Sequence, residues 1–214
     1  MVDQALNLYR QGWFPMDLDD PKQPGVQWVQ PHERALIPLD GFRTSRSLRA
    51  KVRKQVFRVT TDHAFGRVIR ACAGPRSYAD GTWLHPEIIA LFELFHAAGH
   101  AHSVEAWLDT PAGPELVGGL YGLAIGRVFC GESMFSQPDR GGTDASKVCL
   151  VHLVSHLRAR GFAVLDAQMP NHHTDQFGAT LVGTDHYQKL LTEHAGPEHE
   201  RAWLPFIDRS DRAG

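Results

Sequence analysis

Cysteine is scarce in this 214-residue sequence, which contains three, at positions 72, 130 and 149. Because their number is odd and their spacing wide, they favour neither a disulfide framework nor a paired-cysteine zinc site. The sequence also lacks any apolar run near the roughly 18 residues that a membrane-spanning helix needs. Its first residues lack the basic and then apolar layout of a secretory signal. These absences predict a protein of the reducing cytoplasm.

The composition is that of an ordinary globular protein, with 43% hydrophobic and 21% charged residues. The formal net charge of −2 hides a basic segment between residues 41 and 58 that contains no acidic residue. Such a segment suits a polyanion, because each neutralised phosphate releases counterions. A solvated helix face explains the same pattern without a ligand, so both interpretations stay open. The basic residues are Arg43, Arg46, Arg49, Lys51, Arg53, Lys54 and Arg58.

Local signals divide the chain into two parts. Residues 1–58 are irregular, with a short amphipathic helix and short predicted strands near 26–29 and 35–38. We interpret them as a small N-terminal domain. Residues 59–214 carry regular signals, in the order two helices, three strands, a long helix, a short strand and a final helix.

The predicted helices of the second part have recognisable starts. Asp62 is a good N-cap for the first, Pro86 suits the first turn of the second, and Asp144 or Thr143 is expected to cap the long one. The order of elements matches the GNAT acyltransferase fold. We therefore expect an α+β protein whose mixed, mostly antiparallel sheet is flanked by helices. A shared topology argues for a fold and not for a chemistry.

The stretch 116–147 contains more glycine than strands need when they only bury one face. Glycine in a strand often marks a bulge or a close approach of a ligand or another backbone. One carboxylate, Glu132, follows this apolar run, so we expect an apolar cleft with a carboxylate at its edge. The glycines are Gly118, Gly119, Gly122, Gly126 and Gly131.

Asp166 and Gln168 lie two positions apart on the predicted strand FAVLDAQ, so they are expected to share one face. An Asp at the end of an apolar strand is costly to bury unless it is paired. It could cap the next turn, or it could orient an amide that accepts a hydrogen bond from a reacting amine. For Glu132, a solvated edge residue and a functional carboxylate are equally compatible with the spacing.

Two other types of site are not favoured by the spacing. Ser133 is not predicted to be a nucleophile, because GESMF lacks the second glycine of a nucleophile elbow. The histidine pairs at 100 and 102 and at 172 and 173 have no acidic or cysteine partner at metal-ligand spacing, so no metal site is predicted. The tryptophans could pack in the core or stack on nucleobases.

Several segments together resemble one family, the leucyl/phenylalanyl-tRNA–protein transferases, which are bacterial N-end-rule aminoacyltransferases. The resemblance covers nearly the whole chain, and the GESMFS segment with its apolar lead-in is its most specific part. The segments are GWFPM (12–16), WVQPHERALIPL (28–39), DHAFGRVIRACA (62–73), GTW (81–83), GHAHSVEAW (99–107), LVGGLYGLAIGRVFCGESMFS (116–136), ASK (145–147) and DAQMPNHH (166–173).

The resemblance implies an enzyme that moves Leu or Phe, and less readily Met, from aminoacyl-tRNA to a protein with an N-terminal Arg or Lys. The product is a peptide bond that marks the acceptor for degradation. Because the tRNA ester is already activated, neither ATP, coenzyme A nor a metal is implied. We expect a monomer that works without a membrane.

The family's functional residues map onto matching positions. Asp166 and Gln168 match its catalytic Asp and Gln, and Asp166 is expected to polarise the Gln168 side chain. Glu132 matches a carboxylate of the same site, and Trp83 a tryptophan near the tRNA 3′ adenosine. The aminoacyl pocket is expected from Leu120, Phe129 and Leu153, with Ser133 beside it. Arg46, Arg49, Arg53 and Lys54 match the tRNA-binding patch, which the charge pattern extends to Arg43 and Lys51.

The sequence departs from the family pattern at Met16, where a tryptophan is common, and in an insertion at 138–143. Its start also falls late, so we expect a trimmed small domain. Two rival functions stay open. A coenzyme A-dependent N-acetyltransferase fits the topology, but SQPDRGGTDAS does not match that family's pyrophosphate loop. A non-catalytic RNA-binding module fits the basic segment but leaves Asp166, Gln168 and Glu132 without a role.

Overall fold

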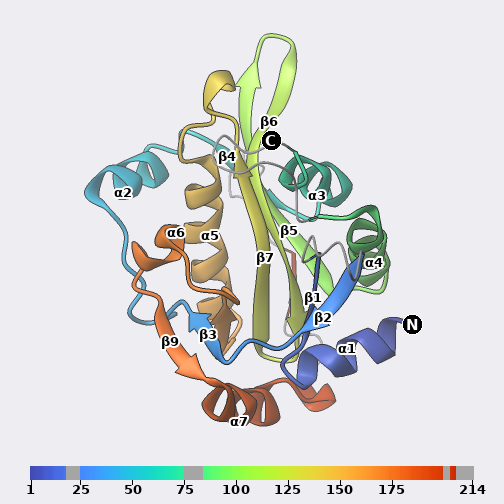
Figure 1. The fold of residues 1–214 in the computed structure, drawn as a ribbon. Helices are drawn as coiled ribbons and strands as arrows, with labels where there is room; N and C mark the ends of the chain where they lie inside the picture. The colour runs from blue at the N-terminus through green and yellow to red at the C-terminus, as the bar shows by residue number, and fades with distance from the viewer. Residues whose placement is uncertain (18–24, 75–83, 200–202, 206–214) are drawn as a thin grey trace.

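A computed structural model describes residues 1–17, 25–74, 84–199 and 203–205. Its centre is a seven-stranded sheet in the order β4-β5-β6-β7-β8-β3-β9 (Figure 1). Every neighbouring pair is antiparallel except β7 and β8, which are parallel. This confirms the expected α+β class with a mixed, mostly antiparallel sheet. The strands are β3 (Glu33–Leu36), β4 (Arg58–Thr61), β5 (Ala101–Thr110), β6 (Gly113–Ile125), β7 (Val128–Ser136), β8 (Val164–Asp166) and β9 (Thr180–Gly183).

Helices cover both faces of this sheet. α3 (Phe65–Cys72) and α4 (Pro86–Ala97) pack on one face, and α5 (Ala145–Ala159) packs on the other (Figure 1). Successive residues of a strand therefore enter different cores: Val128 of β7 joins the α3–α4 side, and Phe129 joins the α5 side. Because both faces are buried, the strands read as continuous apolar runs rather than as alternating ones.

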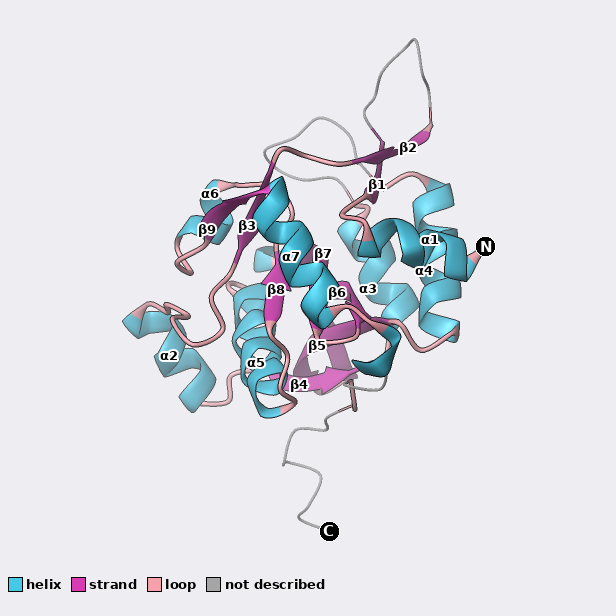
Figure 2. Ribbon diagram, turned by 90° about the horizontal axis from the view of Figure 1, so that it is seen from below, coloured by secondary structure: helices cyan, strands magenta, loops and turns pink. Residues whose placement is uncertain are grey.

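The remaining helices lie around the edges of the sheet. α1 contributes Leu6 and Tyr9 to the core shared by α3 and α4. Figure 2 shows α7 across one end of the sheet, between the β3–β9 pair and α1. No helix within the described ranges is long and apolar enough to cross a bilayer. These outer helices are α1 (Val2–Arg10), α2 (Arg46–Arg53), α6 (His172–Asp175) and α7 (Thr184–His194).

Two predicted helix caps differ from the structure. α3 begins at Phe65, after Ala64, without a side-chain cap, because the carboxylate of Asp62 is engaged elsewhere. The Asp62 carboxylate accepts from the Ser103 backbone N–H at 2.9 Å and contacts His102 Nδ1 at 2.9 Å.

The other two predicted helix starts concern α5 and α4. Asp144 does precede α5, but its backbone is left-handed and its carboxylate makes no cap hydrogen bond. The expectation for Pro86 is confirmed, since it opens α4.

The first 58 residues contribute directly to the main sheet. β3 lies between β8 and β9, so this segment supplies an internal strand. The predicted strand at 26–29 is β2 (Val26–Val29), which pairs with β1 (Phe14–Asp17) in a separate two-stranded sheet. A division of the chain at residue 58 into two domains stays a prediction.

Candidate active site

A β-bulge directs the side chain of Glu132. In the β6–β7 pairing, Tyr121 lies opposite Ser133 and Gly122 opposite Gly131, so Glu132 is the extra residue. A bulge bends its strand and re-aims a side chain. Gly122 is required here, because a Cβ at this position would clash with the Cys130 carbonyl oxygen and the Phe129 ring.

The end of β8 places Asp166 and Gln168. The strand stops at Asp166, and Gln168 follows in a left-handed conformation with φ of 61°. The Gln168 backbone N–H donates to Asp166 Oδ1 at 2.7 Å, which holds this uncommon conformation. The expected contact between Asp166 and the Gln168 side chain is therefore replaced by a backbone contact, because Gln168 lies beyond the strand.

The turned backbone brings the Gln168 side chain to Glu132. Gln168 Nε2 donates to Glu132 Oε2 at 2.7 Å, and the Tyr9 hydroxyl donates to Oε1 at 3.0 Å. Burial raises the pKa of Glu132 to about 7, although these two hydrogen bonds act in the opposite direction. The site therefore contains a carboxylate that titrates near neutral pH.

Asp166 has a different environment, an ion pair with Arg34 of β3. Both side chains are almost wholly inaccessible to solvent. The Tyr187 hydroxyl of α7 donates to Asp166 Oδ2 at 2.7 Å. The Arg34 guanidinium lies 4.8 Å from the centre of the Phe14 ring and 4.5 Å from that of Tyr187. A buried ion pair needs such additional partners, since both ions lose their hydration.

Glu132, Gln168 and Asp166 thus form one connected cluster. The family resemblance predicts all three together, whereas the sequence pattern predicted only the proximity of Asp166 and Gln168 and left Glu132 open. The chemical consequence concerns the Gln168 amide. In its ionised form Glu132 accepts but cannot donate, and Gln168 accordingly turns its nitrogen toward it. Its amide oxygen then faces away from Glu132 and can accept a hydrogen bond from a substrate amine.

Three partners of this cluster, Tyr9, Arg34 and Tyr187, were not predicted from the sequence. One signal was available for Arg34, since a lone cation within the short apolar segment RALI needs a buried anion. Nothing local distinguishes Tyr9 or Tyr187 from ordinary core aromatics.

The residues expected to form the aminoacyl pocket lie together. Leu120, Phe129 and Leu153 belong to the buried cluster between the sheet and α5. Trp203 also belongs to it, and its ring stacks on Phe129 at 5.5 Å. Ser133 lies next to Glu132 on β7 and is half-buried. Trp83 falls outside the described residues.

The basic segment forms α2 and the turns on either side of it. Ser45 caps the start of the helix, because its hydroxyl accepts from the Leu48 backbone N–H at 3.1 Å. Lys51 is half-buried and forms an ion pair of 2.7 Å with Asp144, which joins α2 to the start of α5. The other basic residues of the predicted patch are exposed: Arg43, Arg46, Arg49, Arg53 and Lys54.

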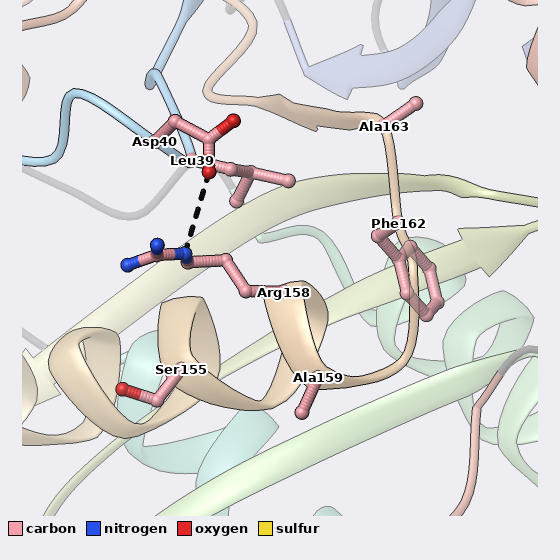
Figure 3. A pocket seen from close by; sticks show the side chains of 7 residues that line it. All are labelled: Leu39, Asp40, Ser155, Arg158, Ala159, Phe162 and Ala163. Atoms are coloured by element: carbon pink, nitrogen blue, oxygen red, sulfur yellow. Dashed lines mark ion pairs between the residues drawn. The ribbon is translucent and has the colours of Figure 1, made fainter.

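A surface cavity of about 680 Å³ is lined by residues outside the cluster of Glu132, Gln168 and Asp166 (Figure 3). Arg158 and Asp40 form an ion pair of 3.5 Å across it. It adjoins the start of β8, whereas Asp166 and Gln168 lie at the end of that strand. None of its lining residues is Glu132, Gln168 or Asp166. Its lining residues are Leu39, Asp40, Ser155, Arg158, Ala159, Phe162 and Ala163.

Comparison with known proteins gives one consistent family. The sequence model described as "Leucyl/phenylalanyl-tRNA protein transferase" matches residues 36–192. A protein of that name from Chlorobaculum parvum is 46% identical over 194 residues, which cover 91% of this chain and 94% of that protein. Another, from Maricaulis maris, is 44% identical over 206 residues, with 95% of this chain and 90% of that protein covered.

A solved structure, the crystal structure of FemX, shares the fold. Its TM-score is 0.52 at 13% sequence identity, with 85% of this chain and 66% of the FemX chain covered. At this identity the likeness concerns the fold alone.

Proposed function

Because the chain belongs to the leucyl/phenylalanyl-tRNA–protein transferase family, we propose that it transfers Leu or Phe, and less readily Met, from aminoacyl-tRNA to the N-terminal Arg or Lys of acceptor proteins. The product is a peptide bond that marks the acceptor for N-end-rule degradation. The observation that carries the assignment of the site is the Gln168–Glu132 hydrogen bond, which leaves the amide oxygen free to meet an amine. The family favours neither the coenzyme A-dependent nor the RNA-binding alternative.

The transfer replaces an ester bond by an amide bond. The acceptor α-amine, in its neutral form, attacks the ester carbonyl carbon of the aminoacyl-tRNA. A carbon–nitrogen bond forms, the bond to the ribose oxygen of the 3′ adenosine breaks, and the proton lost by the amine ends on that oxygen. A free α-amine has a pKa of about 7.7–8.0, so roughly a fifth to a third of it is neutral at physiological pH.

The proposed roles follow from the contacts of each group. Gln168 accepts a hydrogen bond from the attacking amine through its amide oxygen. Glu132 fixes that amide and attracts the cationic acceptor residue. Asp166 positions Gln168 through its backbone N–H rather than through its side chain. Since an amide is a weak base, most of the rate acceleration comes from placing the amine against the ester.

Substrate recognition divides between the buried apolar cluster under α5 and the basic patch on α2, which packs beside it. Leu120, Phe129 and Leu153 take the aminoacyl side chain, with Ser133 beside them and Trp83 near the 3′ adenosine. Packing selectivity of this kind amounts to roughly 1–3 kcal/mol per methylene. The tRNA backbone contacts the basic patch of Arg43, Arg46, Arg49, Lys51, Arg53 and Lys54.

The proposal also covers the fold type, the domain division, the oligomeric state and the cellular location of the protein. The parallel β7–β8 pair within an otherwise antiparallel sheet, together with the likeness to FemX, supports a GNAT-like acyltransferase fold. We propose residues 59–214 as the catalytic domain and 1–58 as a small N-terminal domain that carries the tRNA-contacting segment. The protein acts as a monomer in the cytoplasm, where its three free, buried cysteines would stay reduced.

A transfer assay tests this function. The purified protein is incubated with radiolabelled Phe-tRNA and an acceptor protein that starts with Arg, and label in the acceptor is counted. The matched control acceptor carries an acetylated N-terminus and should take no label. Leu-, Met-, Val- and Ile-tRNA are then compared as donors. Absence of transfer from both Leu- and Phe-tRNA would contradict the function, and equal use of Val would contradict the apolar pocket.

A further inference from the structure

Tyr9 joins the N-terminal helix to the candidate active site. Its hydroxyl donates to Glu132 Oε1 across 123 residues of sequence. The side chain is 1% exposed, and its ring meets Trp28 and Phe95 edge-on, with ring centres 5.8 and 6.1 Å away. Packing on the ring therefore fixes the hydroxyl, and the carboxylate is the partner that satisfies it.

The hydroxyl acts as a donor, because burial and then the neighbouring Glu132 raise the pKa of Tyr9 well above its ordinary value. Glu132 thus has one donor on each oxygen, Tyr9 on one and Gln168 on the other. Two donors on opposite oxygens prevent the carboxylate from rotating. The direction of the Gln168 amide depends on this fixed carboxylate.

We propose that Tyr9 is a positioning residue of the transfer reaction. Its hydroxyl holds Glu132, and through Glu132 it holds the Gln168 amide with the oxygen toward the incoming amine. The inference rests on the proposed function, and no local sequence pattern indicates it. Other groups around Glu132 are Gln168 and Asp166 at the end of β8, and Arg34 from β3.

The direct test is the titration of Glu132 in a Tyr9→Phe variant, which keeps the ring and removes one hydroxyl. Carbon-13 NMR of labelled glutamate side chains follows Glu132, with Glu132→Gln identifying its signal. Losing a donor disfavours the charged carboxylate, so the midpoint should move from near 7 to about one pH unit higher. An unchanged or lower midpoint would overturn the proposal.

A second substitution tests the same bond in the opposite direction. Replacement of Tyr9 by 3-fluorotyrosine makes the phenol a stronger donor with little change of volume. The Glu132 midpoint should then fall below that of the unmodified protein. This variant keeps the question open to experiment should Tyr9→Phe fold poorly, and a rise in the midpoint would contradict the proposed contact.

Kinetics separate positioning from stability. In Tyr9→Phe, kcat should fall about tenfold while KM for Phe-tRNA stays unchanged, because the basic patch is untouched. Leu6→Ala, on the same helix and 2% exposed, is the packing control. It should lower the melting temperature at least as much but leave kcat and the Glu132 midpoint unchanged. If the wild-type protein shows no transfer, the proposed function is refuted. If the wild type is active and the Tyr9→Phe variant has the same kcat and the same Glu132 midpoint, only the inference about Tyr9 is refuted.

Discussion

The two carboxylates of the site differ in the charge of their partners. Asp166 is paired with the buried Arg34 guanidinium, whereas Glu132 receives hydrogen bonds from two neutral groups, Tyr9 and Gln168. Neutral donors compensate burial less than a cation does, and the pKa of Glu132 is accordingly raised to about 7. Carboxylates held in different environments can take different roles in one reaction.

Glu132 should give the protein a measurable dependence of stability on pH. The pKa of Glu132 is about 4.5 in an unfolded chain and about 7 in the folded protein. The contribution of Glu132 to folding stability is therefore fully present below about pH 4.5 and is lost as pH rises through about 7. Glu132→Gln removes this loss. The quantity to compare is the unfolding free energy of Glu132→Gln minus that of the wild type. Between about pH 4 and pH 8 this difference should rise by on the order of 2–3 kcal/mol, after allowance for the partial exposure of Glu132. Urea unfolding across this range measures it, and a constant difference would contradict the raised pKa.

Asp166 and Gln168 should respond differently to substitution. Asp166→Asn leaves the Arg34 charge buried without a counter-ion, so we expect a loss of stability of about 3–5 kcal/mol as well as of activity. Gln168→Ala should lose less stability, about 1–3 kcal/mol for the unpaired Glu132 oxygen, but lower kcat/KM by about 100-fold. Thermal melts and transfer kinetics distinguish the two. Gln188→Ala on α7 is the matched amide control and should keep near-normal transfer.

At the scale of elements, the β6–β7 bulge decides where the carboxylate points. The glycines around it were expected to mark a bulge or a close approach, and Gly122 serves both. The structure confirms this expectation at a position where any side chain would meet the Cys130 carbonyl and the Phe129 ring.

Gly122→Ala should therefore disturb the site without touching a reacting group. Overpacking in a core costs about 1–3 kcal/mol, and here the strain falls on the strand that carries Glu132. We expect a lower melting temperature together with a disproportionate loss of kcat. Gly41→Ala is the control, because its added methyl group would make only ordinary contacts with Pro38. Retention of full activity by Gly122→Ala would show that the bulge tolerates adjustment.

At the scale of the whole molecule, distant parts of the chain assemble the site. The N-terminal segment supplies Tyr9 and Arg34, and α7 supplies Tyr187. α1 and α7 also contact each other, since Gln188 Nε2 of α7 donates to the Arg10 carbonyl of α1 at 3.2 Å. α7 thus covers the end of the sheet that carries the site, with α1 beside it (Figure 2).

The charge distribution of the whole molecule predicts how tRNA binding depends on salt. An Arg46→Ala, Arg53→Ala double variant should weaken binding and lower the slope of log Kd against log salt by about one per phosphate contact removed. Lys51→Ala should change the slope less, because Lys51 is already paired with Asp144. Fluorescence anisotropy with labelled tRNA at several salt concentrations measures both. Equal slopes for the double variant and the wild type would remove α2 from the tRNA interface.

Local sequence patterns were enough to predict most of the helices and strands and to single out candidate residues for the site. Helical periodicity with Pro86 at the first turn predicted α4, and an apolar run that ends in Asp166 predicted β8. Such signals lie within a few residues of one another, and backbone hydrogen bonding acts over the same range. The family resemblance then selected Asp166, Gln168 and Glu132 from many polar residues.

The partners of those residues depended on how the folded chain packs. Tyr9 reaches Glu132 across 123 residues and Arg34 reaches Asp166 across 132, and no local pattern encodes either contact. Asp62 shows the same limit, because its carboxylate binds β5 rather than capping α3. Burial makes each polar group take whichever partner the fold brings near, so the pKa of Glu132 and the direction of the Gln168 amide are properties of the assembled core.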